Sequence, residues 1–129
     1  MRSLRNKSVL IVDDNPAMVR ALERVLRGEG ATVMPATEGA EAVEILTRRE
    51  KVIDLVITDL RMPFVNGVTL VYAIHEVFAE LPVIVLTAFG SEDVKEECLR
   101  QGAVALLEKP LDTSELLAVI EDAFTPLED

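Results

Sequence analysis

The chain has a single cysteine, no tryptophan and few aromatic residues of any kind. Cys98 has no second cysteine with which to form an intramolecular disulfide, which agrees with a reducing compartment. Aromatic residues amount to 4% of the sequence, whereas hydrophobic residues amount to 50%. The core must therefore consist of Val, Leu, Ile and Ala, a composition common in α/β proteins with a buried parallel sheet.

Long hydrophobic runs are also missing. No apolar run approaches the roughly 18 residues of a membrane span, and the apolar run at 9–12, behind a basic N-terminus, is too short for a signal peptide. We therefore expect a cytoplasmic protein with no membrane partner. The length of 129 residues suits one domain over residues 1–129, with a core from about residue 8 to residue 124.

Basic residues are in the minority, with 13 lysines and arginines against 23 acidic residues and a formal net charge of -10. Phosphates of nucleic acids are bound by basic patches, so we expect no direct contact with nucleic acid. Two explanations of the acidity stay open. It serves solubility alone, or it reflects local clusters of acids that hold a cation.

Five short apolar runs alternate with five segments whose apolar residues recur at helical spacing. The predicted strands cover residues 7–12, 32–36, 55–58, 82–87 and 104–107. Such an alternation indicates right-handed crossovers and a parallel sheet covered on both faces. We predict an α/β fold of the doubly wound type, with five parallel strands and five helices. If the strand order is 2-1-3-4-5, the flavodoxin-like order, the first and third strands are neighbours at the topological switch point.

Helix starts are marked by capping residues. Asn15 precedes Pro16 at the first predicted helix, and Asp112 with Glu115 forms a capping box at the last. Helical spacing places Val43 and Val77 on the inner faces of the second and third helices.

Five polar residues follow or end strands of this predicted sheet. Asp13 and Asp14 come after the first strand, Asp59 after the third and Lys109 after the fifth, while Thr87 ends the fourth. Carboxyl ends of parallel strands lie at one edge, so these side chains should converge at the topological switch point. Three carboxylates this close repel one another and need a hard cation, for which Mg²⁺ is the natural choice. With a lysine and a hydroxyl they form suitable parts for phosphoryl transfer, in which an aspartate can be the nucleophile.

Four spaced motifs in this element order resemble the receiver domain of the two-component response regulator family. They are V-L-I-V-D-D-N at 9–15, D-L-R-M-P-F-V-N-G at 59–67, L-T-A at 86–88 and E-K-P at 108–110. The resemblance covers the chain from about residue 8 to residue 124. It implies a signalling phosphoacceptor rather than an enzyme, which takes a phosphoryl group on Asp59 from a sensor histidine kinase or phosphotransfer protein.

The same resemblance implies roles for the other site residues. Asp14 and Asp59, with Asp13 through water and the backbone carbonyl of Arg61, would hold Mg²⁺. Thr87 and Lys109 would contact the phosphoryl oxygens and report the change through a face made of the fourth helix, the fifth strand and the fifth helix. A cis bond between Lys109 and Pro110 is also implied.

Two departures from the family pattern concern signalling and the lifetime of the phosphoryl group. Leu106 stands where family members commonly carry Tyr or Phe, and Ala105 replaces a frequent Asp. Arg61 and Phe89 occupy the two positions that tune attack of water on the acyl phosphate in this family. A long side chain and a ring there should screen that water, so we expect a long-lived phosphoryl group.

Other interpretations of the same residues remain. Asp13 and Asp14 are each ordinary loop or capping residues if taken alone. A Mg²⁺-dependent phosphohydrolase with an aspartyl nucleophile is the main alternative function, although Arg61 stands where such enzymes need a second acid. A flavin carrier of the same topology is disfavoured by the acidic loop and the scarcity of aromatic rings.

A downstream effector is expected as a partner. The sequence leaves open whether the chain forms a homodimer and whether it stands alone or belongs to a longer regulator.

Overall fold

The structure is a computed structural model that describes residues 4–48, 52–61, 66–88 and 91–124. Strands and helices alternate along the whole chain, as the sequence predicts. They are β1 (Ser8–Val12), α1 (Pro16–Gly28), β2 (Thr32–Ala36), α2 (Gly39–Arg48), β3 (Leu55–Asp59), α3 (Gly67–Val77), β4 (Val83–Thr87), α4 (Glu92–Arg100), β5 (Ala105–Glu108) and α5 (Thr113–Phe124).

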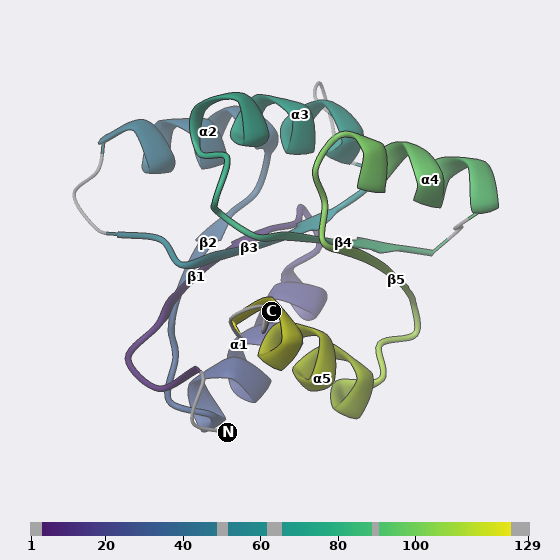
Figure 1. Cartoon of the computed structure of the whole chain (residues 1–129). Coiled ribbons are helices and arrows are strands. Elements are labelled where there is room, and N and C mark those ends of the chain that lie inside the picture. Colours follow the sequence, from purple (N-terminus) through teal and green to yellow (C-terminus); the bar gives the residue numbers. More distant parts are fainter. Residues whose placement is uncertain (1–3, 49–51, 62–65, 89–90, 125–129) are drawn as a thin grey trace, which may run out of the picture.

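The five strands form one parallel sheet in the order β2-β1-β3-β4-β5, which confirms the predicted topology. Helices cover both faces of this sheet. Figure 1 shows α2, α3 and α4 on one face and α1 and α5 on the other. This arrangement follows from right-handed βαβ crossovers, which change faces where the strand order reverses between β1 and β3.

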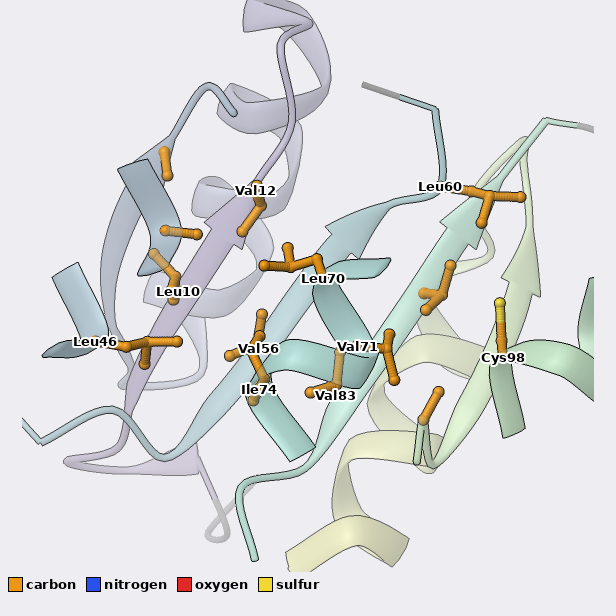
Figure 2. Packing of buried hydrophobic residues seen from close by; sticks show 14 of the residues in the cluster. Leu10, Val12, Leu46, Val56, Leu60, Leu70, Val71, Ile74, Val83 and Cys98 are labelled. Atoms are coloured by element: carbon orange, nitrogen blue, oxygen red, sulfur yellow. The ribbon is translucent and has the colours of Figure 1, made fainter. Parts of the chain in front are cut away.

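Neighbouring residues of each strand point to opposite faces and so build two cores. Leu10 and Val12 of β1 pack under α2 and α3, together with Val56 and Val83 (Figure 2). Val9 and Ile11 belong to the second core, under α1 and α5. Since both faces are covered, the central strands read as continuous apolar runs in the sequence.

Capping side chains begin four of the described helices, two of them at the predicted residues Asn15 and Asp112. The Asn15 side chain accepts hydrogen bonds from the backbone N–H groups of Ala17 and Met18, with Pro16 at the first helical position. The Ser91 hydroxyl accepts from Val94, and the Asp112 carboxylate from Glu115. These bonds satisfy N–H groups that the first helical turn leaves without partners.

Two predicted inner-face residues are exposed instead. Val43 of α2 is 38% exposed, because Ala42 and Leu46 form the buried stripe and Val43 lies about 100° around the helix from Ala42. Val77 is 63% exposed, since it is the last residue of α3 and the following Phe78 packs against the core in its place.

The segment before β1 was not expected to contribute to the core. Leu4 is fully buried against the α1 and α5 face of the sheet. Its carbonyl accepts a hydrogen bond from the Lys7 N–H, and the Lys7 ammonium lies 5.3 Å from the centre of the Phe124 ring. The described helices include none with the length and apolar character needed to span a membrane.

Candidate functional site

Strand register places the predicted site residues at one edge of the sheet. Val12 pairs with Thr58, so the next residues, Asp13 and Asp59, leave β1 and β3 side by side. Asp59 itself is the last residue of β3 and pairs with Leu86, one position before Thr87. Thr87 in turn pairs with Glu108, next to Lys109. The convergence predicted from strand ends is therefore present.

Three carboxylates form a compact cluster at this edge. One carboxylate oxygen each from Asp13, Asp14 and Asp59 lies within 4.8 Å of the others. Asp13 is buried, Asp59 is partly buried and Asp14 is exposed. The cluster therefore reaches from the interior to the surface, with an open side toward solvent.

Asp13 is held rigidly but lacks full hydrogen bonding. Its Oδ1 accepts a hydrogen bond of 2.9 Å from the Asn15 N–H, whereas its buried Oδ2 has no hydrogen-bond partner among the described residues. Burial raises the pKa of Asp13, and the charges of Asp59 and Asp14 raise it further, against the opposing effects of the Asn15 N–H and Lys109. A buried carboxylate oxygen without a donor is a position suited to a cation.

Lys109 is the cation that the chain itself supplies. Its Nζ lies 3.4 Å from Asp59 Oδ1 and 3.7 Å from Asp13 Oδ2, the second distance being too long for a hydrogen bond. The Lys109 N–H donates to the Thr87 carbonyl at 2.8 Å, which joins the ends of β5 and β4. The Lys109–Pro110 peptide bond is cis, as the resemblance implied.

The donor set fits Mg²⁺. Three carboxylates are oxygen ligands of the kind that hard cations prefer, and one ammonium leaves the cluster with excess negative charge. The unsatisfied Oδ2 of Asp13 points to the same conclusion. The residues present are therefore compatible with a magnesium centre made of Asp13, Asp14 and Asp59.

A close backbone contact joins the end of β3 to the start of α3. Asp59 Oδ1 accepts a hydrogen bond from the Leu60 N–H, and the Gly67 N–H donates to the Leu60 carbonyl at 2.7 Å. A Cβ atom on Gly67 would lie 2.8 Å from the Asp59 carbonyl oxygen and 2.8 Å from Leu60 Cα. Only glycine therefore permits α3 to begin this close to Asp59.

The remaining predicted residues have different environments. Thr87 is buried at the end of β4, and Arg61, two residues after Asp59, is exposed. Leu106 is 8% exposed and lines a hollow of about 270 Å³ between α4, β5 and α5, with Ser91, Glu92, Lys95, Glu108 and Glu115 among the other lining residues. Phe89 lies outside the described residues.

Sequence reasoning identified the charged groups of the site but missed the roles of two uncharged residues that position them. Asn15 was interpreted only as a helix cap, although its backbone N–H also holds Asp13. Gly67 appeared in the sequence only as the last residue of the D-L-R-M-P-F-V-N-G motif, although it sets the approach of α3 to Asp59. The D-D-N and N-G pairs in the sequence were the available signals, since a short turn between strand and helix demands such residues.

Comparison with known proteins agrees with this geometry. A family model described as response regulator receiver domain matches residues 9–121. Among solved structures, the CheX–CheY–BeF3–Mg²⁺ complex from Borrelia burgdorferi contains a chain with a TM-score of 0.89 and 32% identity, over 95% of this chain and 92% of that one. The beryllofluoride-activated NtrC4 receiver domain dimer has a TM-score of 0.84 and 31% identity, over 91% of this chain and 95% of that one.

Curated relatives are longer than this chain. The transcriptional regulatory protein GlrR of Escherichia coli is 40% identical over 89% of this chain, but that stretch is 26% of the relative. For the DNA-binding transcriptional regulator NtrC of Escherichia coli the identity is 37%, over 91% of this chain and 24% of the relative. The chain thus spans about a quarter of the length of these relatives.

Proposed function

Since the chain belongs to the response regulator receiver domain family, we propose that it is a switch controlled by phosphorylation of Asp59. Receiver domains of two-component response regulators are signalling phosphoacceptors. The observation that carries the assignment to this residue is that Asp59 lies in one cluster with the carboxylates of Asp13 and Asp14, with the Lys109 ammonium 3.4 Å from its Oδ1. The proposed donor is the phosphohistidine of a sensor kinase or of a phosphotransfer protein.

The chemistry is a displacement at phosphorus. A carboxylate oxygen of Asp59 forms the new P–O bond while the P–N bond to the donor histidine breaks, and the histidine nitrogen takes up a proton. Asp13, Asp14, Asp59 and the carbonyl of Arg61 would hold Mg²⁺, which neutralises charge on the phosphoryl oxygens. Lys109 binds a second phosphoryl oxygen as a point charge, and the Thr87 hydroxyl donates to a third.

The proposed output passes through the face formed by α4, β5 and α5. Lys109 is joined to Thr87 by a backbone hydrogen bond, so a shift of either residue moves the ends of β4 and β5 together. Leu106 supports this proposal, because it lies on β5 beside Val85 of β4 and lines the hollow between α4, β5 and α5. Its aliphatic side chain would respond by sliding in that hollow, without the rotation of a ring.

A slow loss of phosphate is part of the proposal. Arg61 is exposed two residues after Asp59, and with Phe89 it would screen the acyl phosphate from water. Phosphorylated protein should therefore keep its phosphate for minutes or longer at neutral pH, as measured by intact mass over time. Loss of phosphate within seconds would contradict this role for Arg61 and Phe89.

The partners follow from the relatives. GlrR and NtrC are named as transcriptional regulators, so we propose that the single receiver domain at 1–129, with its core at about 8–124, controls an effector domain or protein. A dimer is recorded for the NtrC4 receiver domain, and the face of α4, β5 and α5 is the proposed contact for a homodimer here. This acidic chain itself is not expected to bind DNA or a membrane.

The test uses a small phosphodonor. Incubation with phosphoramidate and Mg²⁺ should raise the intact mass by one phosphoryl group, and Asp59→Asn should abolish the gain. Asp54→Asn is the matched control, because Asp54 accepts a hydrogen bond from the Ser8 N–H at the opposite end of β3. Turnover of many equivalents of donor would instead favour the Mg²⁺-dependent phosphohydrolase.

A further inference from the structure

The pair Asn66–Gly67 stands at the start of α3 and carries a reactivity of its own. The backbone nitrogen of the residue after an asparagine can attack the side-chain amide, and glycine obstructs that attack least because it has no side chain. Asn66 is exposed, so water and base have access to it. Asn66 is therefore a candidate for loss of its side-chain amide without an enzyme.

The two other asparagines of the chain are poorer candidates. Asn15 precedes Pro16, whose nitrogen has no proton to lose and cannot become the attacking anion. Asn6 precedes Lys7, whose long side chain crowds the approach of its nitrogen. Asn66 is thus the asparagine that the sequence makes most reactive, and the other two serve as internal references.

The chemistry exchanges ammonia for water in two steps. In the first, the Gly67 nitrogen gives up its proton and bonds to Cγ of Asn66. The bond from Cγ to the side-chain nitrogen breaks, and that nitrogen takes up a proton and leaves as ammonia. The product is a cyclic imide whose nitrogen carries no hydrogen. In the second step, water opens the ring at one of its two carbonyl groups and leaves either an aspartate or an isoaspartate at position 66.

The folded start of α3 opposes this reaction. The Gly67 N–H donates a hydrogen bond of 2.7 Å to the Leu60 carbonyl, and Asn66 Oδ1 accepts one of 2.9 Å from the Thr69 N–H. Ring closure removes the hydrogen of the first bond and draws Cγ of Asn66 out of its capping position. Because both bonds must be given up, the reaction requires local opening of the start of α3.

The two products differ in their effect on the neighbouring Asp59. An aspartate keeps the capping oxygen and adds a negative charge at a helix N-terminus, where that charge is favourable. An isoaspartate instead lengthens the main chain by one carbon directly before Gly67. Space is lacking there, since a Cβ on Gly67 would already lie 2.8 Å from the Asp59 carbonyl oxygen and 2.8 Å from Leu60 Cα. An isoaspartate must therefore displace either α3 or the segment that contains Asp59.

We propose that Asn66 is a modification site that the fold keeps closed, and that isoaspartate at this position prevents Asp59 from accepting phosphate. The modification itself stands on Asn66 and its hydrogen bonds, whereas its consequence rests on the proposed function of Asp59. Molecules in which the start of α3 has opened are the ones that react. Ageing thereby removes such molecules from the population that can be phosphorylated.

Peptide mapping of aged protein tests the modification. Wild type is kept in neutral buffer and in urea, and digests are analysed for the mass gain from ammonia to water and, with an isoaspartate methyltransferase, for isoaspartate. A synthetic peptide of residues 60–72 gives the intrinsic rate in each solution. Relative to this peptide, Asn66 should react about tenfold more slowly in the folded protein, because two hydrogen bonds must break first. In urea it should match the peptide and react before Asn6 and Asn15.

Two results overturn the modification site. In the first, Asn66 of the folded protein reacts at the rate of the peptide, so that the start of α3 gives no protection. In the second, Asn6 or Asn15 reacts faster than Asn66 in urea, so that the sequence does not favour Asn66.

Separated products test the consequence for Asp59. The isoaspartyl fraction of aged wild type should be phosphorylated by phosphoramidate about 100-fold more slowly than fresh protein, the loss that a displacement of about 1 Å causes at a reacting group. Its melting temperature should also be lower. Asn66→Asp reproduces the other product and should behave as fresh wild type in both measurements. Asn66→Ser keeps a capping oxygen but cannot form the imide, so it should retain full phosphorylation after the same ageing.

The outcomes separate this inference from the proposed function. Phosphorylation of the isoaspartyl fraction at the rate of Asn66→Asp overturns the consequence. An equal loss of phosphorylation in aged Asn66→Ser and aged wild type assigns the loss to another residue and overturns it as well. If fresh wild type gains no phosphate from phosphoramidate, the proposed function fails. The displacement caused by isoaspartate is then judged by melting temperature, and a value equal to that of Asn66→Asp overturns it.

Discussion

The Lys109 ammonium lies 3.4 Å from the Asp59 carboxylate across 50 residues of sequence, and 3.7 Å from the buried carboxylate of Asp13. One flexible side chain thus bridges the two acids that the central strands bring to the sheet edge. Because Lys109 is 20% exposed and Asp13 is 2% exposed, the contact is shielded from solvent mainly on the side of Asp13.

Removing this ammonium should destabilise the fold. Lys109→Met keeps much of the side-chain volume but leaves Asp13 and Asp59 facing each other without a cation. We expect a loss of about 1–3 kcal/mol in the free energy of unfolding in urea without Mg²⁺. The loss in unfolding free energy caused by Lys109→Met should be smaller in an Asp13→Asn background, because Lys109 and Asp13 contact each other and their substitutions are not additive. Lys95→Met, on the exposed side of α4, should change stability little. Equal effects of the two lysine variants would show that the bridge contributes nothing.

Magnesium should raise the melting temperature of the wild type. Binding to the folded state alone stabilises it by about 2.7 kcal/mol at a concentration 100 times the Kd. Asp13→Asn and Asp14→Asn should abolish most of this gain, because each removes a ligand from the cluster, whereas Asp54→Asn should keep it. Differential scanning calorimetry with and without MgCl₂ measures the effect. A gain that survives in Asp13→Asn would place the metal elsewhere.

Gly67→Ala should disturb both the fold and the site. The added methyl group meets backbone atoms of Asp59 and Leu60 at 2.8 Å, so the start of α3 must move. Overpacking of this kind costs about 1–3 kcal/mol, and a displaced Asp59 loop should slow phosphorylation by phosphoramidate. Gly28→Ala is the matched control, because its methyl group would meet nothing within 4 Å and should be neutral or stabilising. Normal stability and phosphorylation of Gly67→Ala would show that the contact is unimportant.

How far the sequence predicts this site depends on the kind of residue. Asp13, Asp59 and Lys109 could be predicted because the end of a strand is visible in the sequence, and a parallel sheet brings such ends to one edge. The unsatisfied oxygen of Asp13 and the close approach of Gly67 to Asp59 could not be predicted, since they depend on the positions of individual atoms in the folded chain, such as the 2.8 Å between a Cβ on Gly67 and the Asp59 carbonyl oxygen.

The same limit applies to the fold. The parallel sheet and its cover of helices on both faces follow from the alternation of apolar runs and helical patterns. The strand order does not follow from that alternation alone, because other doubly wound orders share it. Leu4 escaped prediction, because a single apolar residue in a polar, basic segment carries no periodicity. Val77 was misplaced because helical spacing continues to the last residue of α3, although Phe78, just after the helix, packs against the core in its place.

Cys98 should be unreactive in the folded protein. The side chain is fully buried, and burial, with a smaller effect of Glu97, raises the pKa of its thiol. The thiolate is the reactive form, so labelling by DTNB at pH 8 should be slow without urea and fast with it. As the folded-state pKa lies above that of the unfolded chain, stability should be unaffected by this group below about pH 8.5 and fall only as the pH rises further. Val52→Cys in a Cys98→Ser background, at a site that is 78% exposed, should be labelled at once. Rapid labelling of native Cys98 would contradict its burial.

The central claim is that Asp59 carries the phosphoryl group, and the chemistry of acyl phosphates tests it directly. Protein treated with phosphoramidate and Mg²⁺ is reduced with borohydride, which converts an aspartyl phosphate to homoserine, and is then digested and sequenced by mass spectrometry. We predict homoserine at position 59 alone, present only when both phosphoramidate and Mg²⁺ were added. Homoserine at position 13 or 14, or a phosphorylated protein without homoserine at any position, would contradict the account.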